Sequence, residues 1–201
     1  MVLNSPRSGT AEVLRFDADG SNPAKLASGE LARPACSPDG KHVFYVELGS
    51  PQKIWRVPIE GGMPVEVANV LGDSVVGRLS ISSDGKMIAY PFEEFTPSPK
   101  MKLAIIPVEG GPAVKILDAP GDVYGRGLPL WSPDGKGLEY ILTQNGSSNI
   151  WEQPLTGGPP RQLTTFSSGR IFDFNWSRDG KRLLLARGEV SSDVVLLSHL
   201  H

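Results

Sequence analysis

The residue patterns that could support catalysis are mostly missing from this sequence of 201 residues. It contains no Gly-x-Ser-x-Gly nucleophile elbow and no Gly-x-x-x-x-Gly-Lys-Ser/Thr phosphate-binding loop. The glycine-rich loop, the His-Arg-Asp motif and the Asp-Phe-Gly motif of protein kinases are absent as well. We therefore predict no catalytic residue and no cofactor-binding residue, and we expect that this chain is not an enzyme.

Histidine, cysteine and carboxylate residues do not occur in this sequence at the spacing that is typical of metal ligands. Two of the three histidines, His199 and His201, belong to the last three residues, and His42 stands far from them. Aspartates at equivalent positions could suggest a ring of cation ligands: Asp39, Asp84, Asp134 and Asp179. Each of these aspartates already has a role in a tight turn, so we predict no metal site.

The cysteine and the tryptophans also have structural interpretations. Cys36 falls on the apolar face of a predicted strand, which indicates a small buried hydrophobic residue rather than a reactive thiol. Trp131 and Trp176 occupy one position of a repeated first strand, and Trp55 and Trp151 occupy one position of a repeated third strand. Packing between repeats explains these rings better than a sugar-binding platform does.

A repeated six-residue turn organises the chain around these residues. It reads Trp-Ser-Pro-Asp-Gly-Lys at 131–136, and near-copies occupy 36–41, 81–86 and 176–181. Proline presets the turn, the aspartate side chain can bond its own backbone, and glycine takes the left-handed position. Apolar residues alternate on both sides of each turn, so the two arms of each hairpin bury one face.

A second hairpin follows each of the first three turns. It consists of a strand such as Ile54–Ile59, a Gly-Gly turn and a short strand such as Val65–Val67. Two hairpins make four strands, and successive turn aspartates are 45, 50 and 45 residues apart, as Asp39, Asp84, Asp134 and Asp179 show. This period is typical of β-propeller blades.

The predicted fold is therefore all-β, a propeller of four-stranded antiparallel blades in one domain over 1–201. We place a partial blade at 1–30, blades at about 31–75, 76–125 and 126–170, and a partial blade at 171–201. The partial blades hold two and three predicted strands, the last of them at 193–197. About four blades are present; they could nearly close a four-bladed ring, but we favour an arc of a larger propeller.

Bulk properties argue against two classes of partner. The net charge is −2, from 20 basic and 22 acidic residues without a run of like charge, so no nucleic-acid-binding surface is predicted. The sequence has no apolar run of membrane-spanning length, and 1–7 do not resemble a signal peptide. We expect no membrane insertion by this chain, and its localisation stays open.

The Ser-Pro-Asp-Gly-Lys turns, the Ile-Trp third strands and the Gly-Gly turns resemble the WD40-like (PD40) repeats of TolB-type β-propellers. The segment 174–181 and the closing 193–197 look closer still to propellers attached C-terminally to bacterial Ser/Thr protein kinases and winged-helix regulators. The Trp-Asp ending of true WD40 blades is absent. This resemblance implies an extracytoplasmic or periplasmic location if the parent is a membrane kinase or a TolB-like protein.

Two functions are compatible with such a propeller. The first is a non-catalytic module for protein–protein interaction or ligand sensing, within a larger signalling protein such as a Ser/Thr kinase. The second is an accessory, substrate-gating propeller of a prolyl-oligopeptidase-like serine peptidase, whose hydrolase domain is absent from this sequence. Since propellers host unrelated activities, the repeat itself does not decide between them.

A protein or peptide partner is the expected ligand, and loop variation suggests where it binds. The repeated turns occupy one end of the blades, so recognition is expected at the other end, where loops differ. The second blade carries an insertion at 92–100, and the loop at 122–126 lies on the same face. We predict that Phe95, Tyr124 and Arg126 contribute to a partner-binding patch, because exposed aromatic and arginine side chains are favoured at interface hot spots.

Overall fold

The computed structural model describes residues 1–5, 10–95, 98–119, 129–177 and 179–190. These residues form eighteen strands and no helix, and the strands pair antiparallel in five sheets. None of the described segments forms a helix with the length and hydrophobicity needed to cross a membrane. The predicted all-β fold class is confirmed.

The five sheets follow one another along the chain. The N-terminal sheet contains β1 (Val2–Ser5), β2 (Ala11–Arg15) and β3 (Ala24–Gly29). The first blade contains β4 (Leu31–Cys36), β5 (His42–Glu47), β6 (Lys53–Pro58) and β7 (Val65–Asn69). The second blade contains β8 (Ser74–Val75), β9 (Ser80–Ile81), β10 (Met87–Glu94), β11 (Lys100–Pro107) and β12 (Lys115–Asp118). The third blade contains β13 (Leu130–Trp131), β14 (Gly137–Gln144), β15 (Ser147–Pro154) and β16 (Arg161–Gln162), and the C-terminal sheet contains β17 (Arg170–Trp176) and β18 (Leu183–Gly188).

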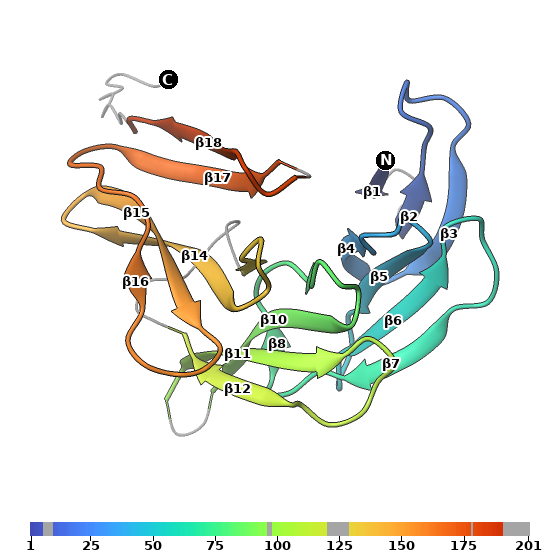
Figure 1. The fold of residues 1–201 in the computed structure, drawn as a ribbon. Helices are drawn as coiled ribbons and strands as arrows, with labels where there is room; N and C mark the ends of the chain where they lie inside the picture. The colour runs from blue at the N-terminus through green and yellow to red at the C-terminus, as the bar shows by residue number, and fades with distance from the viewer. Residues whose placement is uncertain (6–9, 96–97, 120–128, 178, 191–201) are drawn as a thin grey trace, which may run out of the picture.

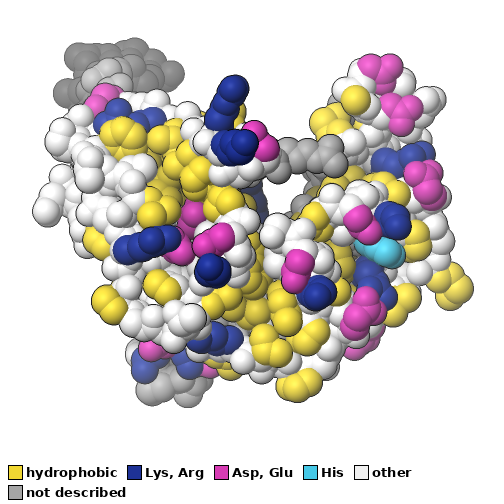
Figure 2. All heavy atoms as spheres, in the orientation of Figure 1, with side chains coloured by type: hydrophobic (Ala, Val, Ile, Leu, Met, Phe, Trp, Pro, Cys, Tyr) yellow, Lys and Arg dark blue, Asp and Glu magenta, His cyan; other side chains and the backbone are white. Residues whose placement is uncertain are grey.

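The sheets are arranged as an arc. Figure 1 shows the N-terminal sheet at one end and the C-terminal sheet at the other, with the three blades between them. In Figure 2 the two ends of the arc stand apart, and Lys/Arg and Asp/Glu side chains are interspersed on the visible face. Arg78, between β8 and β9, pairs with Asp173 of β17 at 3.1 Å, which links the second blade to the C-terminal sheet. The arrangement is that of a partial propeller.

Strand numbers at the two ends differ from the sequence prediction in one respect. The N-terminal sheet has three strands rather than two, because Val2–Ser5 pairs with Glu12–Arg15 of β2. The third strand predicted for the last blade, at 193–197, lies outside the described residues. In the second blade the first strand is divided, since β8 and β9 both pair with β10.

The four Asp-Gly turns share one hydrogen-bond pattern. In the turn at 131–136, Ser132 Oγ donates to Asp134 Oδ1 at 2.7 Å, and Lys136 N donates to the same oxygen at 3.0 Å. The other turns repeat both bonds. The serine bond, followed by the backbone bond, lowers the pKa of Asp134. Gly135 has a φ of 69°, the left-handed conformation that glycine adopts without strain. The turn role of these residues is confirmed.

The second strands bury side chains on both faces rather than on the one face that was predicted, because alternate residues pack into the cores on opposite sides of a blade. Val43, Ile88 and Leu138 occupy one repeat position, and all three are completely buried. The prediction that Cys36 is buried is wrong, because Cys36 is exposed. A register shift between Ala32 and Ala35 interrupts β4, and Ala35 packs against the core while Cys36 is left exposed at the strand end.

Candidate functional site

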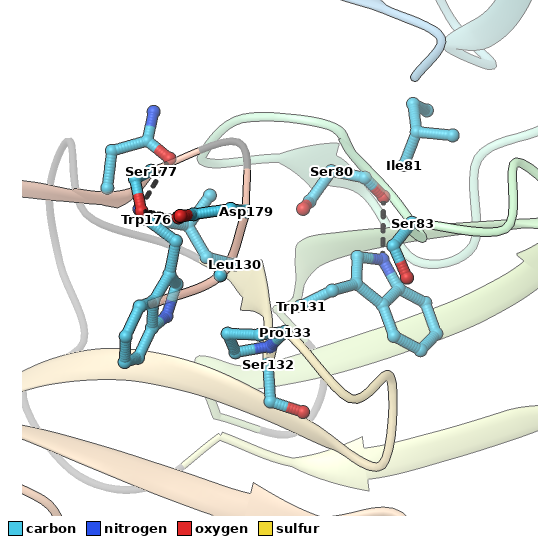
Figure 3. A pocket seen from close by; sticks show the side chains of 12 residues that line it. Ser80, Ile81, Ser83, Leu130, Trp131, Ser132, Pro133, Trp176, Ser177 and Asp179 are labelled. Atoms are coloured by element: carbon cyan, nitrogen blue, oxygen red, sulfur yellow. Dashed lines mark hydrogen bonds between the residues drawn. The ribbon is translucent and has the colours of Figure 1, made fainter. Parts of the chain in front are cut away.

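Hollows occur between neighbouring blades at the end that carries the Asp-Gly turns. One cavity of about 310 Å³ is lined by residues of β9, β13 and β17 and by the turns that follow these strands. Figure 3 shows this cavity, with Trp131 and Trp176 on either side of Pro133. The Trp131 Nε1 donates to the Ser80 carbonyl oxygen at 3.0 Å, across the boundary between the second and third blades. This bond supports the packing role predicted for Trp131.

A second cavity lies between the third blade and the C-terminal sheet and holds most of the ionisable groups of interest. Its volume is about 380 Å³. We call it the glutamate cavity, and its lining residues are Ser132, Pro133, Asp134, Glu139, Glu152, Arg161, Leu163, Trp176 and Leu183. One side of the lining is therefore acidic, whereas tryptophan, leucine and proline provide apolar surface.

Two glutamates face each other across the strands of the third blade. Glu139 of β14 and Glu152 of β15 are register partners, and only 1% and 4% of their surfaces are exposed. Trp176 Nε1 of β17 donates to Glu139 Oε2 at 2.6 Å. Arg161 of β16 pairs with Glu152, with Nε donating to Oε2 at 2.8 Å. Strands from both sheets thus hold the two carboxyl groups in place.

The surroundings change the protonation of Glu139. Burial raises its pKa to about 7, the hydrogen bond from Trp176 opposes this rise, and the neighbouring Glu152 adds to it. A carboxyl with this pKa exchanges a proton near neutral pH, and its ionised form attracts cations. The described residues contain no group of three or more His, Cys, Asp and Glu side chains placed to hold a metal ion. The chemistry available here is proton exchange or binding of an organic cation.

Gly137 makes room for the Glu152 side chain. A Cβ atom at Gly137 would overlap Glu152 Oε1, Cγ and Cδ. The strand backbone of β14 therefore approaches the carboxylate more closely than any other residue type would permit. Gly137 does not adopt a left-handed φ. Glycine is required at this position because it has no side chain.

These residues were not predicted from the sequence, because the repeats were defined by the residues that they have in common. Glu139 corresponds to Phe44 and Ala89 in the first two blades, and Glu152 corresponds to Arg56 and Ile105, counted from the turn and from the Ile-Trp strand. Gly137 similarly replaces His42 and Met87. The available signal was a glutamate at a position that is apolar in the first two blades, and a second glutamate where those blades have an arginine and an isoleucine.

The predicted partner-binding patch is only partly within the described structure. Phe95 follows β10, at the end of the blades opposite the Asp-Gly turns, and 51% of its surface is exposed. Its backbone N donates to Asp73 Oδ2 at 2.7 Å. Tyr124 and Arg126 lie outside the described residues. The joint patch therefore stays a prediction.

Comparisons with known proteins give distant similarities. No protein-family model matches the chain. The uncharacterized peptidase YuxL of Bacillus subtilis is 27% identical over 157 residues, which are 75% of this chain and 22% of YuxL. Tricorn protease homolog 1 of Streptomyces coelicolor is 28% identical over 102 residues, 51% of this chain and 9% of that protein. The chain thus spans less than a quarter of the length of either relative.

Solved structures show the same fold. TolB from Acinetobacter baumannii superposes with a TM-score of 0.70 at 21% identity, over 96% of this chain and 47% of TolB. The acylaminoacyl peptidase of Pyrococcus horikoshii gives a TM-score of 0.66 at 13% identity, over 95% of this chain and 34% of that one. The β-propeller domain of the Trilobed protease from Pyrococcus furiosus gives 0.58 at 13% identity, over 94% of this chain and 59% of the domain. The chain has a TolB-like propeller fold.

Proposed function

We propose that this chain is a propeller module that controls access of peptides to a serine-peptidase hydrolase domain, and that it binds those peptides without cleaving them. The observation that carries the proposal is the match to YuxL, which covers 75% of this chain but only 22% of a protein named as a peptidase. A propeller domain of another protease has the same fold. The second function considered from sequence is thus better supported than attachment to a kinase.

The described residues are compatible with a protein in which the propeller binds the peptide and another domain hydrolyses it. A serine peptidase needs a nucleophile beside a histidine base. His42 is the histidine within the described residues, and it pairs in a strand with Pro58. Hydrolysis in this proposal belongs to another domain, and the propeller supplies selection of the substrate.

The decisive experiment is to determine the complete coding sequence around this chain. A Gly-x-Ser-x-Gly elbow followed by an aspartate and a histidine would support the proposal. Kinase motifs in the same reading frame, or a reading frame with neither motif set, would overturn it. As a biochemical check, a fluorophosphonate probe that labels active serines should not label this chain, while it labels a serine peptidase mixed in as the positive control.

A second candidate is a TolB-type interaction module, favoured by the superposition over 96% of this chain. In that case the partner is a protein bound at the end of the blades near Phe95. Replacing Phe95, Tyr124 and Arg126 together by alanine should then weaken capture of the partner and leave the melting temperature nearly unchanged. If the triple variant captures the partner as well as the wild type does, the proposed partner-binding patch is wrong.

A further inference from the structure

We propose that the glutamate cavity binds an organic cation, namely an ammonium or guanidinium group carried on a short apolar stem. The proposal does not depend on an attached hydrolase. It starts from the way in which the third blade departs from its own repeat. Gly137, Glu139, Glu152 and Arg161 all differ from their counterparts in the first two blades, and all four come together at one cavity or its wall.

The carboxyl groups leave part of their hydrogen-bonding capacity unused. Glu139 is 1% exposed, and its Oε2 accepts the indole N–H of Trp176. Its Oε1 accepts no hydrogen bond from any described residue, although Glu139 lines the cavity. A carboxylate oxygen without a protein donor can accept charge-assisted hydrogen bonds from the N–H groups of a bound cation.

The balance of charge also favours a cation. The lining holds three carboxyl groups, of Asp134, Glu139 and Glu152, and one cationic side chain, Arg161. Arg161 is committed to Glu152, and Asp134 is committed to its turn. Glu139 therefore lines the cavity without an ion pair to any described cation, although the charge of Arg161 acts on it from a greater distance.

The remaining lining fits the stem of such a ligand. Pro133, Leu163, Trp176 and Leu183 supply apolar surface to the cavity. A volume of about 380 Å³ lies at the lower end of the range for small-ligand sites, which suits a group of a few carbon atoms. A divalent metal ion is a poorer match, because the described residues offer no set of three ligands.

Binding should be coupled to release of a proton. The cation attracts the ionised form of Glu139, whose pKa is raised to about 7 in the free protein. Below that pH the ligand must displace a proton, so its affinity should fall by up to tenfold for each unit of pH. The groups that face Glu139 are Glu152, Asp134 and Arg161, together with the Trp176 N–H, and none of these becomes a new cation over that range.

The test uses the whole chain and three probes: n-butylammonium, n-butylguanidinium and leucine amide. Titration is followed by the indole N–H resonance of Trp176, with that of Trp55 as an internal reference. At about pH 7.5 one or more probes should shift the Trp176 resonance, and the affinity should fall about tenfold or more at about pH 5.5. Relative affinities of the three probes distinguish a lysine-like side chain, an arginine-like side chain and a peptide amino terminus as the source.

Matched variants separate the site from general effects. Glu139→Gln retains an acceptor for Trp176 and should weaken binding at least tenfold. Glu47→Gln is the control, because Glu47 Oε2 likewise accepts an indole N–H, from Trp55 at 2.8 Å, and lies outside the glutamate cavity. Leu163→Phe, which occupies the cavity without changing its charge, should also block binding. Equal affinity in the wild type and Glu139→Gln, equal affinity at both pH values, or the same resonance shift with Ca²⁺ alone would overturn the proposal.

Discussion

The interface between the first and second blades and the interface between the third blade and the C-terminal sheet are built from the same repeat and stabilised differently. The former contains a cluster of thirteen buried apolar residues. The latter contains three buried apolar residues, six partly buried ones, and two buried glutamates. One interface is a hydrophobic core, whereas the other exchanges part of its apolar contact for ionisable groups and a cavity.

A ladder of ion pairs shows the same contrast. Arg15 of β2 pairs with Glu60 at 3.1 Å, and Arg56 of β6 pairs with Glu109 at 2.7 Å. Each arginine lies in the strand that takes the third place in the four-strand repeat, which is β2 in the N-terminal sheet and β6 in the first blade. Each glutamate lies in the Gly-Gly turn region of the following blade. Between the second and third blades, the equivalent positions hold Ile105 and Thr156, so both members of the ion pair are replaced together.

The third blade then has Glu152 where the ladder has arginine. Its partner, Arg161, comes from the same blade instead of the next one. The comparison teaches that the backbone of the repeat tolerates a reversal of charge at one position when a neighbouring strand provides the counterion. Scaffold and site are therefore separable in this fold.

The largest expected difference between the interfaces comes from removing an apolar side chain at one repeat position. Ile88 and Leu183 each lie four residues after a turn aspartate, but Ile88 is completely buried and Leu183 only partly. Ile88→Ala should lower the free energy of unfolding by about 2–5 kcal/mol, because it leaves a cavity in a packed core. Leu183→Ala should cost about 1–2 kcal/mol.

Urea denaturation followed by circular dichroism measures both values. The slopes of the unfolding curves should agree among the variants, so that the midpoints report stability. Equal losses for the two variants would mean that the C-terminal sheet is packed as firmly as the central blades, and the contrast between the interfaces would fail.

The second expected effect is a dependence of stability on pH that arises at the glutamate interface. The pKa of Glu139 is about 7 in the folded chain and 4.5 for an ordinary glutamate, so the folded state binds the proton more tightly. The resulting stabilisation is present at acidic pH and is lost as the pH rises through about 7. Glu139→Gln does not titrate, so from about pH 5 to pH 8 it should gain about 1–2 kcal/mol relative to wild type, after allowance for screening by water in the cavity.

Thermal melting at several pH values tests this expectation. Trp176→Phe provides the matched control, because removing the indole N–H removes a contact that opposes the raised pKa of Glu139. That variant should shift the pH-dependent loss of stability to higher pH. Parallel profiles for the wild type and Glu139→Gln would show that Glu139 does not titrate between folding and unfolding in this range.

The parts of the fold that sequence could predict are those fixed by local interactions. A turn such as 131–136 closes its hydrogen bonds within a few residues. The strand that follows it does not alternate in burial, because its first four residues are all buried. The order of the blades along the chain could also be predicted, because the same local pattern recurs at a regular spacing. By contrast, β1 depends on pairing with β2 rather than on a repeated motif, and it was not predicted.

The candidate site escaped prediction because it depends on contacts between strands that are distant in sequence. Glu139 meets Trp176 of the next sheet, 37 residues later, and Glu152 meets Arg161 of the adjacent strand. Neither residue belongs to a known catalytic motif. Cys36 was misassigned for a related reason, since the register shift in β4 interrupts the alternation on which the assignment was based.

The smallest expected effect concerns the ion-pair ladder of the other interface. Arg56 and Glu109 are 2.7 Å apart, but 74% of the Glu109 side chain is exposed. Water and salt screen such a pair, and ordering two long side chains costs entropy, so its coupling energy should be below about 1 kcal/mol. A double-mutant cycle with Arg56→Ala and Glu109→Ala measures this coupling, and a repeat in high salt should reduce it further. Because Ile105 and Thr156 replace this pair at the next interface, a small value explains how the chain loses the ladder there without losing the fold. A coupling above about 2 kcal/mol would instead make the ladder a main support of the first interface, and the apolar cluster alone would no longer account for the difference between the two interfaces.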